Sequence, residues 1–201
     1  MSGYHSIDPQ HPDPALIELA ITNLKEGGLI SFPTDTVYGL ACDDQHPDGL
    51  EKLYRIKGRP EGKPIARLAC DIAQVETDGG EFSSTARRLA ETFWPGGMTL
   101  VLTNAKQGAT VGYRVPDDNV AQAILRGFGR PLPVSSANLS GEPDSLSGTA
   151  VQESIGASLD LLLDAGPSGG MQSSTVLLID GDKVVELRAG MISQERWQAR
   201  L

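Results

Sequence analysis

The chain has 201 residues, of which 17 are Lys or Arg and 26 are Asp or Glu, so its formal net charge is −9 with histidine neutral. This balance excludes proteins that coat polyanions, because such binding needs a broad positive field. A nucleotide or other anion must therefore be held by a few residues in a local pocket, and we expect a small partner. One domain is expected at this length.

Cysteine usage and hydropathy indicate the cellular setting. The two cysteines, Cys42 and Cys70, match no metal-ligand spacing. Residues 1–12 lack the charged start and long apolar run of a secretory signal. No stretch approaches the roughly 18 uninterrupted apolar residues of a membrane span. We therefore expect a cytoplasmic protein with no membrane partner and no protein-held metal.

Helical and strand patterns alternate through the first half of the chain. Asp13-Pro14 is typical of a helix start and Gly27-Gly28 of a helix end. Between them, apolar residues recur at helical spacing: Leu16, Leu19, Ala20 and Leu24. The elements that follow are predicted at residues 29–32 (strand), 49–57 (helix), 65–70 (strand), 83–93 (helix) and 99–103 (strand).

The second half continues the alternation and ends in strands. We predict strands at 111–115 and 132–135, a helix at 120–128 and a short helix at 149–155. Further strands are predicted at 159–163, 175–179 and 184–187, the last two joined by the hairpin signal Asp180-Gly181-Asp182. No repeat or linker divides the chain. The pattern predicts one α/β domain with a mixed sheet.

Polar motifs follow two of the predicted strands, where ligands bind in open α/β sheets. Pro33-Thr34-Asp35-Thr36 offers hydroxyls and backbone donors, with Gly39 permitting close backbone approach. Pro133-Val134-Ser135-Ser136-Ala137-Asn138 is rich in uncharged donors that suit phosphate oxygens or an adenine edge. Each motif taken alone is equally consistent with a capped turn.

Cations gather in one short segment of this acidic chain. Lys57, Arg59 and Lys63 lie within seven residues, a combination suited to a polyphosphate. The alternative is a solvated basic helix end, since cations favour a helix C-terminus. Arg114 lies in an otherwise uncharged strand, so it either meets an acidic partner in the fold or awaits an anionic ligand, and the same argument applies to Arg188.

Several motifs in this order resemble those of the YrdC-like threonylcarbamoyl-adenylate synthases, from about residue 13 to residue 192. The markers are Phe32-Pro33-Thr34-Asp35-Thr36-Val37-Tyr38-Gly39-Leu40, Lys57-Gly58-Arg59-Pro60 with Lys63-Pro64, Trp94-Pro95-Gly96, Arg114-Val115-Pro116, Ser136-Ala137-Asn138, Ser174-Thr175-Val176 and Leu187-Arg188. The resemblance implies a single YrdC-like domain over residues 1–201, without the C-terminal domain of longer members. Its expected fold is a twisted open mixed sheet flanked by helices, with a large ligand cavity.

The resemblance also implies an activity. Members condense L-threonine, bicarbonate and ATP into threonylcarbamoyl-adenylate and pyrophosphate, for N6-threonylcarbamoyladenosine modification of tRNA. Downstream tRNA threonylcarbamoyl transferase proteins would consume the product. ATP is a substrate, Mg²⁺ would be carried by its phosphates, and we expect weak or no independent tRNA binding.

By position in the family pattern, Lys57 and Arg59 would be catalytic and grip the ATP phosphates. The other expected ATP ligands are Lys63, Thr110, Ser136, Asn138 and Arg188, and the expected threonine ligands are Thr34, Arg114 and Ser174. Tyr38 and Trp94 are interpreted as core residues. All five cations, Lys57, Arg59, Lys63, Arg114 and Arg188, are expected to converge on one cavity.

Some positions depart from the family pattern. Asp118 stands where many members have His, Ala189 where Pro is common and Leu68 where some longer members have His, and residues 142–149 diverge throughout. Two alternatives therefore stay open. One is a paralogue acting on another carbamoylated or adenylated small molecule, and the other is a non-catalytic RNA-binding or assembly module.

Overall fold

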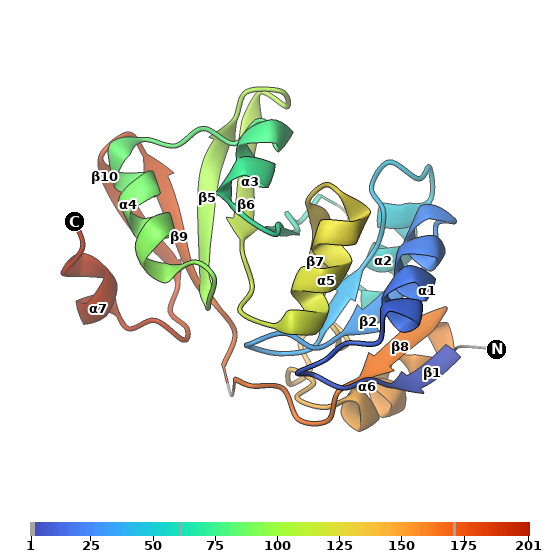
Figure 1. Ribbon diagram of the computed structural model, residues 1–201. Coiled ribbons are helices and arrows are strands. Elements are labelled where there is room, and N and C mark those ends of the chain that lie inside the picture. The colour runs from blue at the N-terminus through green and yellow to red at the C-terminus, as the bar shows by residue number, and fades with distance from the viewer. Residues whose placement is uncertain (1–2, 61, 171) are drawn as a thin grey trace.

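The strands of the described chain join one ten-stranded mixed sheet, in the order β1-β8-β2-β3-β7-β4-β6-β5-β9-β10 (Figure 1). The computed structural model describes residues 3–60, 62–170 and 172–201. The strands are β1 (Gly3–Ser6), β2 (Ile30–Phe32), β3 (Gly39–Ala41), β4 (Arg67–Leu68), β5 (Met98–Asn104), β6 (Ala109–Arg114), β7 (Leu132–Ser136), β8 (Leu161–Asp164), β9 (Thr175–Asp180) and β10 (Lys183–Arg188). The mixed α/β sheet predicted from the sequence is confirmed.

Strand β7 is shared between two halves of the sheet. Its last three residues pair with β3, as Val134 does with Ala41. Its first two residues pair with β4, as Leu132 does with Leu68. We call β1, β8, β2 and β3 the closed half and β4, β6, β5, β9 and β10 the open half, because helices cover them differently.

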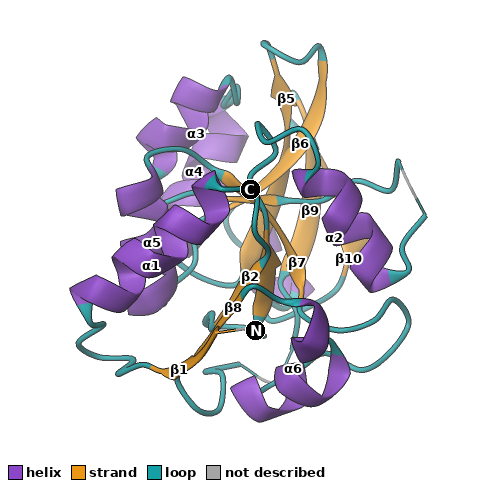
Figure 2. Cartoon of the chain, turned by 90° about the vertical axis from the view of Figure 1, so that its right-hand side faces the viewer, coloured by secondary structure: helices purple, strands orange, loops and turns teal. Residues whose placement is uncertain are grey.

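Helices cover both faces of the closed half and one face of the open half (Figure 2). The helices are α1 (Pro14–Lys25), α2 (Gly49–Lys57), α3 (Ile72–Asp78), α4 (Ser84–Phe93), α5 (Asn119–Phe128), α6 (Gly148–Ser154) and α7 (Gln194–Gln198). In the closed half, α1 and α5 pack on one face, while α2 and α6 pack on the other. In the open half, α3, α4 and α7 bury one face.

Alternation along β5 shows how the open half is divided. Leu100 and Leu102 are buried in the cluster with α4, whereas Thr99 and Val101 point to the opposite face. The helices α3, α4 and α7 all pack against the face that carries Leu100 and Leu102. No helix in the described part of the chain has both the length and the apolar character needed to cross a bilayer.

Local sequence explains where the longer helices begin and end. The Asp13 carboxylate accepts a hydrogen bond from the Ala15 N–H at 2.8 Å, and Pro14 occupies the first turn of α1. Asp118 caps α5 in the same way, through the Ala121 N–H at 2.8 Å. Helix α5 then ends at Gly129, whose φ of 86° is a conformation that favours glycine.

The structure adds five short elements that the sequence patterns did not predict: β1, β3, α3, α7 and a 3-10 helix at Gly156–Ser158. Three-residue β3 depends on partners on both sides rather than on its own pattern. The strand predicted at 65–70 is reduced to two residues, Arg67–Leu68. Leu19, predicted on the buried face of α1, is 37% exposed, while Ile17 and Ile21 are buried instead. Ile7 in the N-terminal segment and Trp197 in α7 are also buried.

Ion pairs tie the two halves together beside β7. Arg67 of β4 pairs with Asp44, after β3, at 2.5 Å and with Asp78, at the end of α3, at 2.8 Å. Arg130, just before β7, pairs with Asp44 at 3.0 Å and also with Asp43. All five side chains are largely buried, so this network fixes the closed half relative to the open half.

Candidate active site

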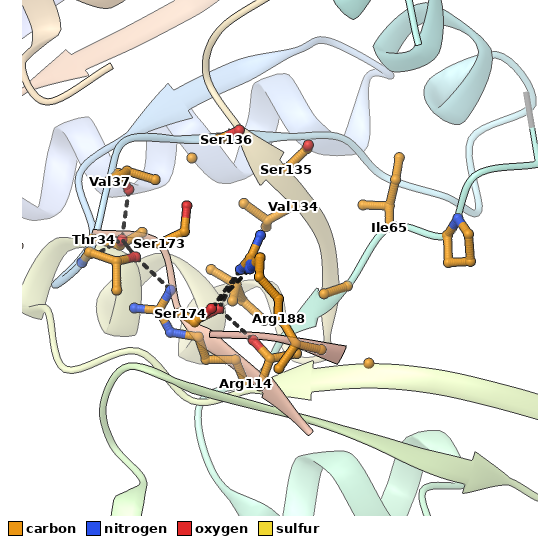
Figure 3. Close-up of a pocket in the computed structure, with 18 of the residues that line it drawn as sticks. Thr34, Val37, Ile65, Arg114, Val134, Ser135, Ser136, Ser173, Ser174 and Arg188 are labelled. Atoms are coloured by element: carbon orange, nitrogen blue, oxygen red, sulfur yellow. Dashed lines mark hydrogen bonds between the residues drawn. The ribbon is translucent and has the colours of Figure 1, made fainter. Parts of the chain in front are cut away.

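A cavity of about 470 Å³ lies on the uncovered face of the open half and extends to β7 and the loop before β3 (Figure 3). Seven of the ten predicted site residues line it: Thr34, Arg59, Thr110, Arg114, Ser136, Ser174 and Arg188. Figure 3 shows Thr34, Arg114, Ser174 and Arg188 gathered at one end, away from Ile65. These residues come from segments that are far apart in the sequence, so the fold assembles the site.

Arg114 is held rigidly at the end of β6. Its guanidinium donates to the Gly96 carbonyl at 3.0 Å and to Thr36 Oγ1 at 2.6 Å, and it pairs with the Asp35 carboxylate. Burial lowers the pKa of Arg114, and the Asp35 carboxylate opposes this shift. The acidic partner expected for a charge in this strand is therefore Asp35, and Arg114 still faces the cavity.

The turn before β3 presents hydroxyls to the same cavity. Thr34 Oγ1 lies 3.0 Å from Thr36 Oγ1 and donates to the Val37 carbonyl at 2.7 Å. It also accepts a hydrogen bond from the Thr36 N–H at 3.1 Å. Gly39 begins β3, and a Cβ there would lie 2.7 Å from Val134 Cγ1 of β7. Glycine therefore lets the turn lie close against β7.

Arg188 and Ser174 form the opposite wall. The Arg188 guanidinium donates to the Ser174 carbonyl at 2.8 Å and to Ser174 Oγ at 3.0 Å. Ser174 Oγ also lies 2.8 Å from Thr99 Oγ1 of β5. Two residues after Arg188, a Cβ on Gly190 would lie 2.4 Å from the Ser173 carbonyl oxygen, so only glycine fits there. Burial lowers the pKa of Arg188.

Arg59 reaches the cavity from the loop after α2, whereas Lys63 does not. The Arg59 guanidinium donates to the Pro64 carbonyl at 2.8 Å, and its Nε has no hydrogen-bond partner among the described residues. Lys63 is exposed, and its carbonyl accepts a hydrogen bond from the Tyr54 hydroxyl at 2.7 Å. Glu61, within the same basic segment, lies outside the described residues.

Lys57 lies behind the cavity wall rather than in the cavity. It is 3% exposed, and its ammonium donates to the Ser136 carbonyl and, at 2.7 Å, to the Asn138 carbonyl. Both carbonyls lie beyond the part of β7 that pairs with β4, which ends at Pro133. Burial and the neighbouring Arg59 charge lower the pKa of Lys57 to about 8. The expected convergence of five cations is thus corrected: three described cations line the cavity, and Lys57 and Lys63 do not.

The remaining predicted residues also divide into some that line the cavity and some that lie behind its wall. Ser136 and Thr110 line the cavity, while Asn138 is buried behind it. The Asn138 amide donates to the Glu142 carbonyl at 2.6 Å and so fixes the turn after β7. Tyr38 is fully buried as predicted, although it also lines the cavity. Trp94 packs edge-on against Phe82, with ring centroids 6.1 Å apart.

Three site residues were missed by sequence reasoning. Asp35 and Thr36 stand inside the quoted motif, and the unpaired charge of Arg114 was the signal for an acidic partner. Asp144 also lines the cavity, and its carboxylate accepts a hydrogen bond from Ser173 Oγ at 2.5 Å. It falls in the divergent segment 142–149, from which the family pattern predicts no ligand.

A second cavity, of about 780 Å³, lies between α3, α5 and the turn at Trp94-Pro95. Asp118, one of the departures from the family pattern, lines it. Burial raises the pKa of the Asp118 carboxyl to about 6, opposed in part by its hydrogen bond with the Ala121 N–H.

The main cavity combines guanidinium groups with several hydroxyls, which is the donor set that binds carboxylates and phosphates. Together with the open α/β sheet, this donor set makes the cavity a candidate site for small anionic molecules between two halves of one sheet.

Comparisons with known proteins give the family. A model for Sua5, YciO and YrdC, described as "Telomere recombination", matches residues 22–190. The "Threonylcarbamoyl-AMP synthase" of Bacillus subtilis is 35% identical over 196 residues, which are 93% of this chain and 56% of that protein. This chain belongs to the Sua5/YciO/YrdC family.

Solved structures agree with this assignment. Pyrococcus abyssi Sua5, complexed with L-threonine, superposes with a TM-score of 0.93 at 28% identity, over 98% of this chain and 60% of that one. Escherichia coli YciO superposes with a TM-score of 0.89 at 28% identity, over 98% of this chain and 100% of that one. The chain thus spans less than two thirds of the B. subtilis and P. abyssi proteins and all of YciO.

Proposed function

We propose that this chain is an L-threonylcarbamoyladenylate synthase, which condenses L-threonine, bicarbonate and ATP into threonylcarbamoyl-AMP and pyrophosphate. The observation that carries the proposal is the convergence of Arg59, Arg114 and Arg188 on one cavity lined with hydroxyls. Three anionic groups must meet in this reaction: the amino-acid carboxylate, the carbamate and the triphosphate. The relatives named above support the choice of reaction.

We infer the residue roles from the family resemblance together with the side chains that line the cavity. Arg114, Thr34 and Ser174 lie together and would bind threonine, with Arg114 on its carboxylate. Arg59, Arg188, Thr110 and Ser136 would face ATP, and Arg59 is the catalytic candidate that touches the leaving pyrophosphate. Lys57 and Asn138 act as positioning residues, because they hold the end of β7 and the turn after it.

The chemistry needs positioning and charge stabilisation rather than a covalent enzyme intermediate. The α-ammonium of threonine first loses a proton, and the resulting amine condenses with bicarbonate to give a carbamate and water. A carbamate oxygen then attacks the α-phosphorus of ATP, and pyrophosphate leaves with the electron pair of the broken P–O bond. Arg188 is already fixed by Ser174, so it can stabilise this charge without reorganising, and Arg114, fixed by Asp35, can hold the threonine carboxylate in the same way.

We propose that magnesium enters with ATP, since Mg²⁺ binds through phosphates, waters and one or two carboxylates. The described residues contain no cluster of three or more His, Cys, Asp or Glu side chains that could hold an ion by themselves. The product would pass to tRNA threonylcarbamoyl transferase proteins, and the net charge of −9 favours weak or no direct tRNA binding. A cytoplasmic location follows from this role.

Pyrophosphate release from ATP tests the proposal. We expect release that requires threonine and bicarbonate together, and mass spectrometry should detect threonylcarbamoyl-AMP. Arg59→Ala should abolish release while leaving the unfolding midpoint nearly unchanged, because Arg59 lies in the loop after α2. Folded wild-type protein that releases no pyrophosphate with both substrates would overturn the assignment.

A paralogue is the second candidate, and one observation favours it. YciO is as similar in sequence as the P. abyssi protein, at 28% identity, and is covered over its whole length. Replacing threonine with other amino acids in the same assay separates the two candidates. A synthase should prefer threonine, although one methyl group contributes only about 1–3 kcal/mol of discrimination against serine.

An RNA-binding module is the third reading. It predicts tight tRNA binding that weakens steeply with salt, because bound phosphates release counterions. The lining of the cavity by Arg59, Arg114 and Arg188 argues for a small ligand instead. Affinity for tRNA measured across salt concentrations distinguishes the two.

A further inference from the structure

Asp144 is the acidic group in a cavity that is otherwise basic. Among the described residues that line the cavity, Arg59, Arg114 and Arg188 carry positive charge and Asp144 carries negative charge. Asp35 neutralises Arg114 but does not itself line the cavity. A carboxylate at this position would repel a bare triphosphate, so its presence calls for a ligand with a cationic group.

Asp144 and Arg188 are held close together without pairing. The Asp144 carboxylate accepts a hydrogen bond from Ser173 Oγ at 2.5 Å, and Arg188 donates to Ser174 Oγ at 3.0 Å. The adjacent residues Ser173 and Ser174 thus form hydrogen bonds with side chains of opposite charge. The Asp144 charge opposes the lowering of the Arg188 pKa by burial, so the two charges interact. Asp144 nevertheless forms no ion pair with any described residue.

This arrangement is complementary to a zwitterion. A carboxylate has about four acceptor positions, and Ser173 uses one of those on Asp144. A ligand with an ammonium and a carboxylate close together could place the ammonium on Asp144 and the carboxylate on a guanidinium. Neither charge would then be left desolvated without a partner.

We propose that Asp144 binds the α-ammonium of the amino-acid substrate and so determines specificity for amino acids over other small carboxylates. The inference rests on the proposed function, and it assigns a role to a residue in the divergent segment 142–149. Asp144 acts before the chemical step: it selects and orients the amino acid whose nitrogen later forms the carbamate.

Asp144→Asn is the informative variant, because the amide oxygen still accepts the Ser173 hydrogen bond while the charge is removed. Glu142→Gln is the matched control, since Glu142 is exposed in the same loop and does not line the cavity. Calorimetry without ATP and with EDTA would measure the binding of L-threonine and of 3-hydroxybutyrate, which lacks the amine. Each titration is repeated with Mg²⁺ and ATP.

The expected result is that Asp144→Asn weakens threonine binding by about fivefold or more, as the loss of a charge-assisted hydrogen bond predicts. Binding of 3-hydroxybutyrate should not weaken, and Glu142→Gln should leave both ligands unchanged. A smaller effect on threonine, an equal loss for both ligands, or a loss confined to the titrations with Mg²⁺ and ATP would overturn the inference. Wild-type protein that binds no threonine would overturn the proposed function itself.

Discussion

The closed and open halves of the sheet bury different kinds of side chain. In the closed half, Phe32, Leu40 and Leu163 are fully buried between helices on both faces. In the open half, Thr99 and Arg114 are buried and face a cavity that no residue of a described helix lines. The comparison shows that the cavity forms where helices leave one face of the open half uncovered. The closed half, which is packed on both faces, supplies the rigid frame.

The largest effect is expected at Arg114, where the open half buries a charge. Arg114→Met should reduce the free energy of unfolding by about 3–5 kcal/mol, because it leaves the Asp35 carboxylate buried without a counterion. Urea denaturation measures this loss. The double variant Asp35→Asn, Arg114→Met should recover part of it, and a loss below about 1 kcal/mol in the single variant would contradict a buried pair.

Leucine truncations compare the two halves directly. Leu163→Ala in β8 should cost about 2–4 kcal/mol, because it opens a void between packed helices and sheet. Leu178→Ala in β9 removes the same atoms from the cavity wall, where solvent replaces them, and should cost about 1 kcal/mol or less. Equal losses in urea denaturation would show that the open face is as tightly packed as the closed half.

Lys57 tests the junction between the halves. Lys57→Met should cost about 1–3 kcal/mol, because the Ser136 and Asn138 carbonyls lose their buried donor. Pyrophosphate release should fall as well, since Ser136 lines the cavity. Lys52→Met in the same helix is the control: its ammonium contacts the Gly27 carbonyl, outside the site, so activity should persist. Full activity in Lys57→Met would contradict the positioning role.

The smallest effect is expected at Asp118, and it depends on pH. Burial raises the pKa of this carboxyl from an ordinary 3.8 to about 6, so the native state binds the proton more tightly than the unfolded state. Native stability therefore falls as the pH rises through this interval. Asp118→Asn keeps the helix cap and should be about 1–2 kcal/mol more stable than wild type above pH 6, after allowance for the lost charge at the helix N-terminus.

Below about pH 4 the gain from Asp118→Asn should vanish, because the wild-type carboxyl is then protonated in both states. Thermal unfolding from pH 3 to 8 measures the difference. Asp117→Asn, at an exposed neighbouring position, should show little of this dependence. A stability difference that does not change with pH would contradict the shifted carboxyl.

Sequence patterns predicted the long elements because each has its own apolar periodicity and its own start and stop residues. Helix α2 begins and ends where predicted, since Gly58 stops it with a φ of 57°. Strand β3 was missed because Gly39, Leu40 and Ala41 have no strand pattern and depend on β2 and β7. Helix α3 was missed because it has only seven residues, between the Asp71 cap and Gly79.

The site was less predictable than the fold. The basic segment favoured an anion site at Arg59, the family resemblance assigned ligands to Arg114 and Arg188, and the structure brings all three to one cavity. The same reasoning failed for Lys57, because only the three-dimensional structure reveals that β7 ends beside it and leaves carbonyls for its ammonium. Chain spacing alone cannot show which polar group a distant carbonyl will bind.

The shared strand β7 has a mechanical consequence. Besides the ion pairs of Arg67 and Arg130, two residue pairs of the described chain join β7 to β4, so the junction depends on side chains more than on backbone hydrogen bonds to resist bending. The cavity lies at the same junction, with Thr36 on one side and Arg188 on the other. A ligand that contacts both sides of the cavity would restrict this bending. Amide hydrogen exchange of Leu132–Ser136 should therefore slow when the ligand binds. The hydrogen-exchange rate of the β7 amides thus reports whether the site is occupied.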